Sequence, residues 1–275
     1  MSTATVTEPR TSLPASATLS FGGVLRAERI KFFSLRSTWW SFGVYVAISI
    51  GLAALMGATF WGEGESIPAE QQTSLVLQVA TFGVFFGQLV MATLGVLVIG
   101  GEFSTGMIRS SFTAVPKRLP VLVAKAIVLG VSAFVLGVVA SLASYAVGGA
   151  FLSSFGVSAS LTDPDLWVPL LGSALYLAVV SVFALGIGTI VRSSAGGITA
   201  AIGAIILLPI ILMMLPVEWL QDLQPYLLMN AGLASFGLNG FTASDLSTAA
   251  NLIIIGIWAA VPLIVGGVLL KRRDA

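Results

Sequence analysis

The stretch 101–118 gathers acidic, basic and glycine residues in a chain that is otherwise poor in charge. Four of its residues recur at intervals i, i+4, i+7 and i+11, so they share one side of a helix. They are Glu102, Gly106, Arg109 and Thr113. Two interpretations follow: a solvated loop whose charges only fix the topology, or a short helix that presents a polar face to a cytoplasmic partner.

A second polar stripe precedes this stretch. Residues 74, 78, 81, 85, 88 and 92 fall within an arc of about 60° on a helix. The members that could line a substrate path are Gln78, Thr81, Phe85 and Gln88. An amide that faces lipid would lack hydrogen-bond partners, which costs a few kcal/mol, so we expect the stripe to face protein or water. Hydrogen bonding between helices and the lining of a path both remain open.

Several kinds of chemistry are excluded by composition. The chain has no histidine and no cysteine, which removes the commonest general base, thiol nucleophiles and the usual zinc ligands. No Gly-Lys-Ser or Gly-Lys-Thr is present, so a phosphate-binding loop of the GxxxxGK[ST] type is absent from the sequence. We therefore predict no catalytic, cofactor-binding or metal-ligating residue, and we do not expect an enzyme.

The elements that must position these residues are membrane helices. Of the 275 residues, 57% are hydrophobic and 9% are charged, whereas soluble domains have roughly 45–50% apolar and about 25% charged residues. Six apolar stretches have the roughly 20 residues needed to cross a bilayer. They are 39–60, 78–101, 119–152, 166–191, 197–215 and 249–270. The prediction is an all-α polytopic membrane protein with six transmembrane helices.

The side chains inside these stretches refine the prediction. Their centres contain no ionisable residue, which argues against a proton relay. Lys125 lies near the inner end of the third stretch, and we expect it to extend to the lipid headgroups. A row of small residues through Gly137 in that stretch predicts a helix-packing face. Pro209 interrupts the fifth stretch and indicates either a kink or a proline tolerated by packing.

The basic residues predict the orientation. All 13 lie in alternate connecting segments or, like Lys125, close to one, and every charged residue of the other segments is acidic. Lys and Arg favour the cytoplasmic side, so both termini, 101–118 and the turn at Arg192 are predicted to be cytoplasmic.

The remaining segments complete the predicted organisation. We expect a flexible tail over 1–20, an amphipathic elbow helix over 21–38, a six-helix domain over 39–270 and a basic tail over 271–275. The external segment 216–248 holds an apolar part at 226–238 that is too short to span, so it is predicted to be re-entrant or interfacial. Arg26, Arg29 and Arg36 of the elbow can contact anionic headgroups, and a tryptophan pair follows them.

Two motifs resemble those of a known family. AERIK at 27–31, with LRSTWW at 35–40, resembles the elbow and first span of bacterial ABC-2 type permeases, the membrane subunits of ABC exporters. EFSTGMIR at 102–109, continuing through Pro116 to Lys125, resembles the loop after their second span. The predicted arrangement, six spans with both termini in the cytoplasm, also resembles that of the family and covers nearly the whole chain.

The resemblance implies a function. In such exporters the loop after the second span docks on a separate ATPase subunit, so Glu102 and Arg109 would be coupling contacts and Gly106 would allow close approach. It implies two ATPase copies that bind ATP and Mg²⁺, a second permease chain as homodimer or heterodimer, and a bacterial plasma membrane. No nucleic acid is expected. The alternatives are a secondary transporter or channel that acts alone, a membrane enzyme, or a membrane anchor or immunity factor without transport activity.

Overall fold

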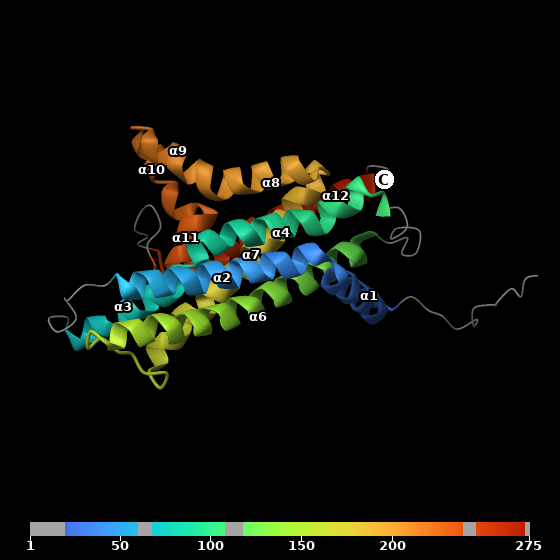
Figure 1. Cartoon of the computed structure of the whole chain (residues 1–275). Coiled ribbons are helices and arrows are strands. Elements are labelled where there is room, and N and C mark those ends of the chain that lie inside the picture. The colour runs from blue at the N-terminus through green and yellow to red at the C-terminus, as the bar shows by residue number, and fades with distance from the viewer. Residues whose placement is uncertain (1–19, 60–67, 108–117, 239–245, 273–275) are drawn as a thin grey trace, which may run out of the picture.

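The structure is a computed structural model, and it describes residues 20–59, 68–107, 118–238 and 246–272. All regular secondary structure in these ranges is helical (Figure 1). The long helices are α1 (Phe21–Ser34), α2 (Arg36–Ala58), α3 (Ala69–Thr81), α4 (Val84–Ser104), α6 (Arg118–Ser153), α7 (Pro164–Val191) and α12 (Thr248–Arg272). Between α7 and α12 lie α8 (Ser194–Ile202), η2 (Gly203–Leu207), α9 (Leu208–Met214), α10 (Glu218–Gln221), η3 (Gln224–Tyr226) and α11 (Leu228–Ala234).

The prediction of six membrane-spanning helices is confirmed. Six helical segments of the described chain are long and apolar enough to cross a membrane. Five of them lie within a few residues of the predicted stretches. The second differs, because it already includes α3 and runs to Ser104 with a break at Phe82 and Gly83. Its first part, α3, is more polar than α4, so the apolar stretch in the sequence begins only at residue 78.

The helix α1 occupies most of the region predicted to form the elbow. It ends at Ser34, and α2 begins at Arg36, so the region 21–38 contains a break that the sequence did not indicate. Two hydrogen bonds stabilise this break: Thr38 Oγ1 donates to the carbonyl of Phe32 at 2.8 Å, and Trp39 Nε1 donates to that of Phe33 at 2.9 Å. Side chains at the start of α2 therefore bind the last turn of α1.

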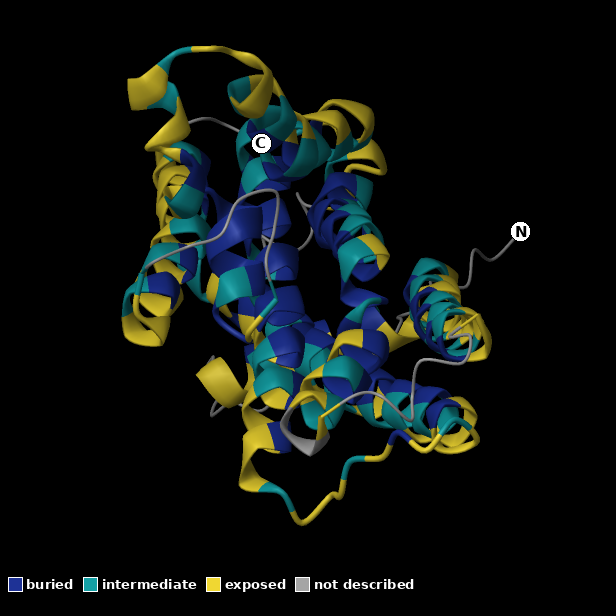
Figure 2. Ribbon diagram, turned by 90° about the vertical axis from the view of Figure 1, so that its left-hand side faces the viewer, coloured by how far each residue is buried: buried dark blue, intermediate teal, exposed yellow. Residues whose placement is uncertain are grey.

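The helix α7 forms the centre of the bundle and packs against α4, α6 and α12. The small-residue face of α6 takes part in this core as predicted, because a Cβ on Gly137 would lie 2.8 Å from the Cα of Ala174. Figure 2 shows buried residues in the interior of the bundle and exposed residues on its outer faces. Many of the exposed residues are large and apolar, such as Val131 and Ile264, which is typical of helices that face lipid.

The fifth span contains a π-helical turn, η2, directly before Pro209. Proline cannot donate the usual hydrogen bond and its ring crowds the carbonyl four residues earlier, and the wider turn accommodates it. The chain then folds back through α10 and η3 into α11. Gln224 Nε2 donates to the carbonyl of Pro209 at 2.9 Å, and Asn230 Nδ2 donates to Gln224 Oε1 at 2.9 Å. Six of the seven residues of α11 are buried, so this short helix is enclosed by protein.

Candidate functional site: a buried ion-pair ring at the end of α4

Four charged residues form a closed ring where α1, α4 and α6 meet. The ring consists of Glu28 and Lys31 of α1, Glu102 of α4 and Lys125 of α6. Lys125 Nζ lies 2.6 Å from Glu28 Oε2 and 2.9 Å from Glu102 Oε1. Lys31 Nζ lies 2.7 Å from Glu102 Oε1 and 3.1 Å from Glu28 Oε1. Each ammonium group thus joins both carboxylates, and the formal charges cancel.

The ring is withdrawn from solvent. The side chain of Lys125 is 4% exposed and those of Glu28 and Glu102 are each 6% exposed, while that of Lys31 is 31% exposed. Removing one member of such a group leaves an uncompensated buried charge, which typically costs about 3–5 kcal/mol. Burial alone would lower the pKa of Lys31, but hydrogen bonds and charge interactions with Glu102 and Glu28 outweigh it and raise that pKa. Lys31 therefore stays protonated at neutral pH.

The expectation that Lys125 extends to the headgroups is wrong. Its ammonium group turns inward and binds carboxylates from two other helices. Two well-placed carboxylates replace the water that the ammonium group loses on burial, so the side chain need not reach the membrane surface. No local pattern indicated this pairing, because Glu28 is 97 positions away from Lys125. Glu28 lies between Val24 and Phe32 at intervals of four residues, and these three residues form the buried face of α1.

The polar face predicted for 101–118 is only partly within the described residues. Glu102 lies in the ring, with its Oε2 atom buried and without a hydrogen bond among the described residues. Gly106 is exposed and has a φ of +71°, a conformation that favours glycine. Arg109 and Thr113 lie outside the described residues. Contact between this face and a partner stays a prediction, and the structure adds that Glu102 binds within its own chain.

A second contact joins the end of α4 to the turn between α7 and α8. The guanidinium carbon of Arg192 lies 5.4 Å from the centre of the Phe103 ring, a cation–π geometry. Arg118 at the start of α6 donates to the carbonyl of Leu270 in α12 at 2.6 Å. These contacts and the ring bring the basic segments of the described chain to one end of the bundle, where α1, the end of α4 and the end of α12 lie (Figure 1).

The four residues of the predicted path differ in their exposure, so they do not line one common surface. Gln78 is exposed on α3 and Phe85 is half-buried, whereas Thr81 and Gln88 are buried. The hydroxyl of Thr81 donates to the carbonyl of Leu77 at 2.7 Å. Gln88 Nε2 donates to the carbonyl of Phe85 at 2.9 Å, and its Oε1 accepts a hydrogen bond from Tyr176 at 2.5 Å. In this conformation Gln88 therefore makes a helix-to-helix contact.

Tyr176 also connects Gln88 to the enclosed helix α11. A Cβ on Gly232 would lie 2.1 Å from Cε2 of the Tyr176 ring, so only glycine fits at this position of α11. The ring of Phe236 lies 6.2 Å from that of Tyr176, centre to centre. The tyrosine is thus held from α4 on one side and from α11 on the other. Neither contact was predicted from the sequence, because Tyr176 lies in an apolar run with no distinguishing spacing.

The six spans and the grouping of basic segments at one end define a polytopic helical membrane protein. Residues 36–275 match the family described as ABC-2 family transporter protein, which is 240 of the 275 residues or most of the chain. The chain therefore belongs to the ABC-2 transporter family, and it is a membrane permease of an ABC transporter. The match confirms the resemblance to ABC-2 type permeases that the two sequence motifs indicated. No match was found among curated proteins.

The family match begins at α2, so α1 lies outside it. Two members of the ring, Glu102 and Lys125, fall within the matched residues, and the other two, Glu28 and Lys31, do not. The ring therefore joins the part of the chain that defines the family to a helix that precedes it.

Proposed function

We propose that the chain is the permease subunit of a bacterial exporter, driven by a separate ATPase subunit that acts through the end of α4 and the segment after it. The observation that carries the proposal is the ion-pair ring. It lies where α4 ends, and it links that end to α1 and α6 by charges that are buried. A force applied to the segment after α4 would therefore reach three helices together.

The physical basis for this coupling is the cost of separating buried charges. Attraction between opposite charges is much stronger in a poorly solvated site than in water, and an unpaired buried charge is costly. Moving α4 alone would break two ion pairs of Glu102 without offering water in exchange. Movement of α1, α4 and α6 as one unit keeps all four pairs. In this proposal the ring converts a local contact into a concerted motion of helices.

The proposal also assigns ATP binding and the membrane domain to different subunits. The chain contains no GxxxxGK[ST] sequence, so ATP and Mg²⁺ would be bound by the partner, in two copies. A second permease chain, identical or related, would complete the membrane domain. The basic end of the bundle would face the cytoplasm of a bacterial cell, since Lys and Arg favour that side. Both termini would then be cytoplasmic, and α1 would lie at the membrane surface as an elbow.

Site-directed cross-linking tests the contact. The chain lacks cysteine, so Met107→Cys places one exposed thiol just after α4, and Ser154→Cys places one at the opposite end of α6. Each variant is purified with the ATPase that accompanies it and treated with a short bifunctional reagent. We expect the ATPase to cross-link to Met107→Cys only, with loss of ATP hydrolysis. Cross-linking from Ser154→Cys alone, or ATP-dependent transport by the permease with no ATPase present, would overturn the proposal.

A further inference from the structure

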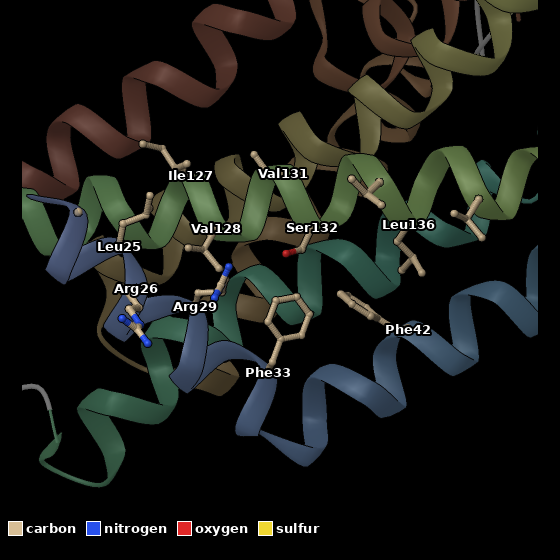
Figure 3. A pocket seen from close by; sticks show the side chains of 13 residues that line it. Leu25, Arg26, Arg29, Phe33, Phe42, Ile127, Val128, Val131, Ser132 and Leu136 are labelled. Carbon is tan, nitrogen blue, oxygen red and sulfur yellow. The ribbon is translucent and has the colours of Figure 1, made fainter.

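A groove of about 820 Å³ runs between α1, α2 and α6 on the outside of the bundle (Figure 3). Its long wall is one face of α6, on which Val131, Val135 and Val139 follow each other at intervals of four residues. Such a row places neighbouring side chains about 5–6 Å apart along the helix. Phe33 of α1 and Phe42 of α2 form the opposite side. The groove is therefore long, apolar and open on the lipid-facing side.

The end of the groove at α1 has a different character. Arg26 and Arg29 line it, and Figure 3 shows both side chains beside the apolar wall. Both are exposed, and within the described parts of the chain neither guanidinium has a carboxylate partner. The acidic side chain of the same helix, Glu28, is already held by Lys31 and Lys125 on the other side of α1. The two arginines are thus available for an anion from outside the described chain.

We propose that this groove binds an anionic phospholipid, with an acyl chain along the valine row of α6 and the phosphate between Arg26 and Arg29. An apolar channel with two cations at one end matches an amphiphile that has a negative headgroup. Guanidinium groups bind phosphate oxygens through paired hydrogen bonds, and basic pockets beside membrane helices bind anionic headgroups. A second protein chain would need acidic side chains aligned with the arginines, whereas an anionic bilayer supplies the headgroup and the acyl chain together.

The position of the site gives the lipid a structural consequence. The headgroup would contact the face of α1 that carries Arg26 and Arg29, while the opposite face holds Glu28 in the ion-pair ring. A bound lipid would therefore hold α1 against α6 from outside, as the ring does from inside. This inference requires only that the helices lie in a bilayer. It does not depend on export or on the contact with an ATPase, so the two proposals can fail separately.

Lipid titration followed by native mass spectrometry tests the site. The purified, delipidated full-length protein is titrated with phosphatidylglycerol and with phosphatidylcholine of the same acyl chains. We expect tighter binding of phosphatidylglycerol at one site. Arg29→Ala should weaken that binding roughly fivefold, and Arg26→Ala/Arg29→Ala should weaken it further. The matched control is Arg36→Ala, which removes an exposed arginine from the start of α2 outside the groove and should leave the site intact.

A second variant tests the acyl-chain part of the groove. Val135→Trp adds bulk at a position that is 54% exposed, so it should fold normally while filling the groove. We expect it to abolish the tight site although both arginines remain. Equal affinity for the two lipids, or equal loss in Arg29→Ala and Arg36→Ala, would overturn the proposal. So would a disulfide between two copies of Val135→Cys in native membranes, because the groove would then be a protein interface.

Discussion

Lys125 of α6 and Glu28 of α1 form an ion pair of 2.6 Å, with the lysine side chain only 4% exposed. The two residues are 97 positions apart in the sequence, so the pair connects the first helix of the described chain to the long helix after the segment 108–117. Glu102 of α4 accepts from the same ammonium group at 2.9 Å. The three helices are thus joined at one buried cation, and replacing that cation is the most direct test of the ring.

We predict that Lys125→Met destabilises the protein by about 3–5 kcal/mol, because two buried carboxylates then share only Lys31. The measurement is reversible unfolding in detergent, or the midpoint of thermal unfolding where reversal fails. Lys271→Met is the control, since it removes an exposed lysine from the end of α12 and should change stability by no more than about 0.5 kcal/mol.

A double substitution separates charge from packing. Glu28→Gln/Lys125→Met removes one charge of each sign and restores the neutrality of the ring. We expect it to be less destabilised than the sum of the two single variants, since residues in one ion-pair network couple by about 0.5–3 kcal/mol. Strict additivity would show that the pair acts only through packing.

We predict that Gln88→Leu lowers stability by about 1–3 kcal/mol, because it leaves the buried hydroxyl of Tyr176 without its acceptor. Tyr176→Phe removes that hydroxyl, so Gln88→Leu/Tyr176→Phe should recover much of the loss. Thermal unfolding of the three variants provides the measurement. Cargo preference, read from cargo-stimulated ATP hydrolysis, should stay unchanged in all three.

The opposite pattern would support the alternative that Gln88 lines a path. In that case Gln88→Leu would keep its stability but change which cargo stimulates hydrolysis. Exposed Gln78 is a suitable comparison, because Gln78→Leu removes the same amide from the outer surface of α3. A shift in cargo preference with Gln78→Leu and none with Gln88→Leu would place the path on that outer surface.

Features that depend on local composition could be predicted from the sequence, whereas contacts between distant helices could not. The six spans depend on length and composition alone, so runs such as 119–152 gave nearly the bounds of α6. The ring depends on which helices meet, and no local pattern relates Glu28 to Lys125. The same holds for Gln88 and Tyr176, which are 88 positions apart. The apolar part of 216–248 was predicted to be too short to span, but the enclosure of α11 depends on its packing against α7 and α12, which no local pattern shows.

We predict that Gly232→Ala destabilises the protein by about 1–3 kcal/mol or more through overpacking. The added Cβ would lie 2.1 Å from the ring of Tyr176, which is fully buried and hydrogen-bonded to Gln88. Gly256→Ala in α12 is the matched control, since nothing lies within 4 Å of its Cβ position. Because alanine favours a helix over glycine, the control should be neutral or slightly stabilising. Equal unfolding midpoints for the two variants would contradict the packing of α11 on Tyr176.

The last prediction concerns orientation. The basic end of the bundle should face the cytoplasm, because Lys and Arg are retained on that side during insertion. In the cysteine-free chain, Thr105→Cys puts an exposed thiol at the basic end and Ser154→Cys puts one at the opposite end. A membrane-impermeant maleimide should label Ser154→Cys in intact cells, and Thr105→Cys only after the membrane is opened. Thr105 and Ser154 both have short polar side chains, and both are exposed at the end of a helix. A difference in labelling between the two variants therefore reports from which side of the membrane each thiol is accessible. Labelling of Thr105→Cys in intact cells, with Ser154→Cys protected, would reverse the orientation and remove the segment after α4 from the reach of a cytoplasmic ATPase.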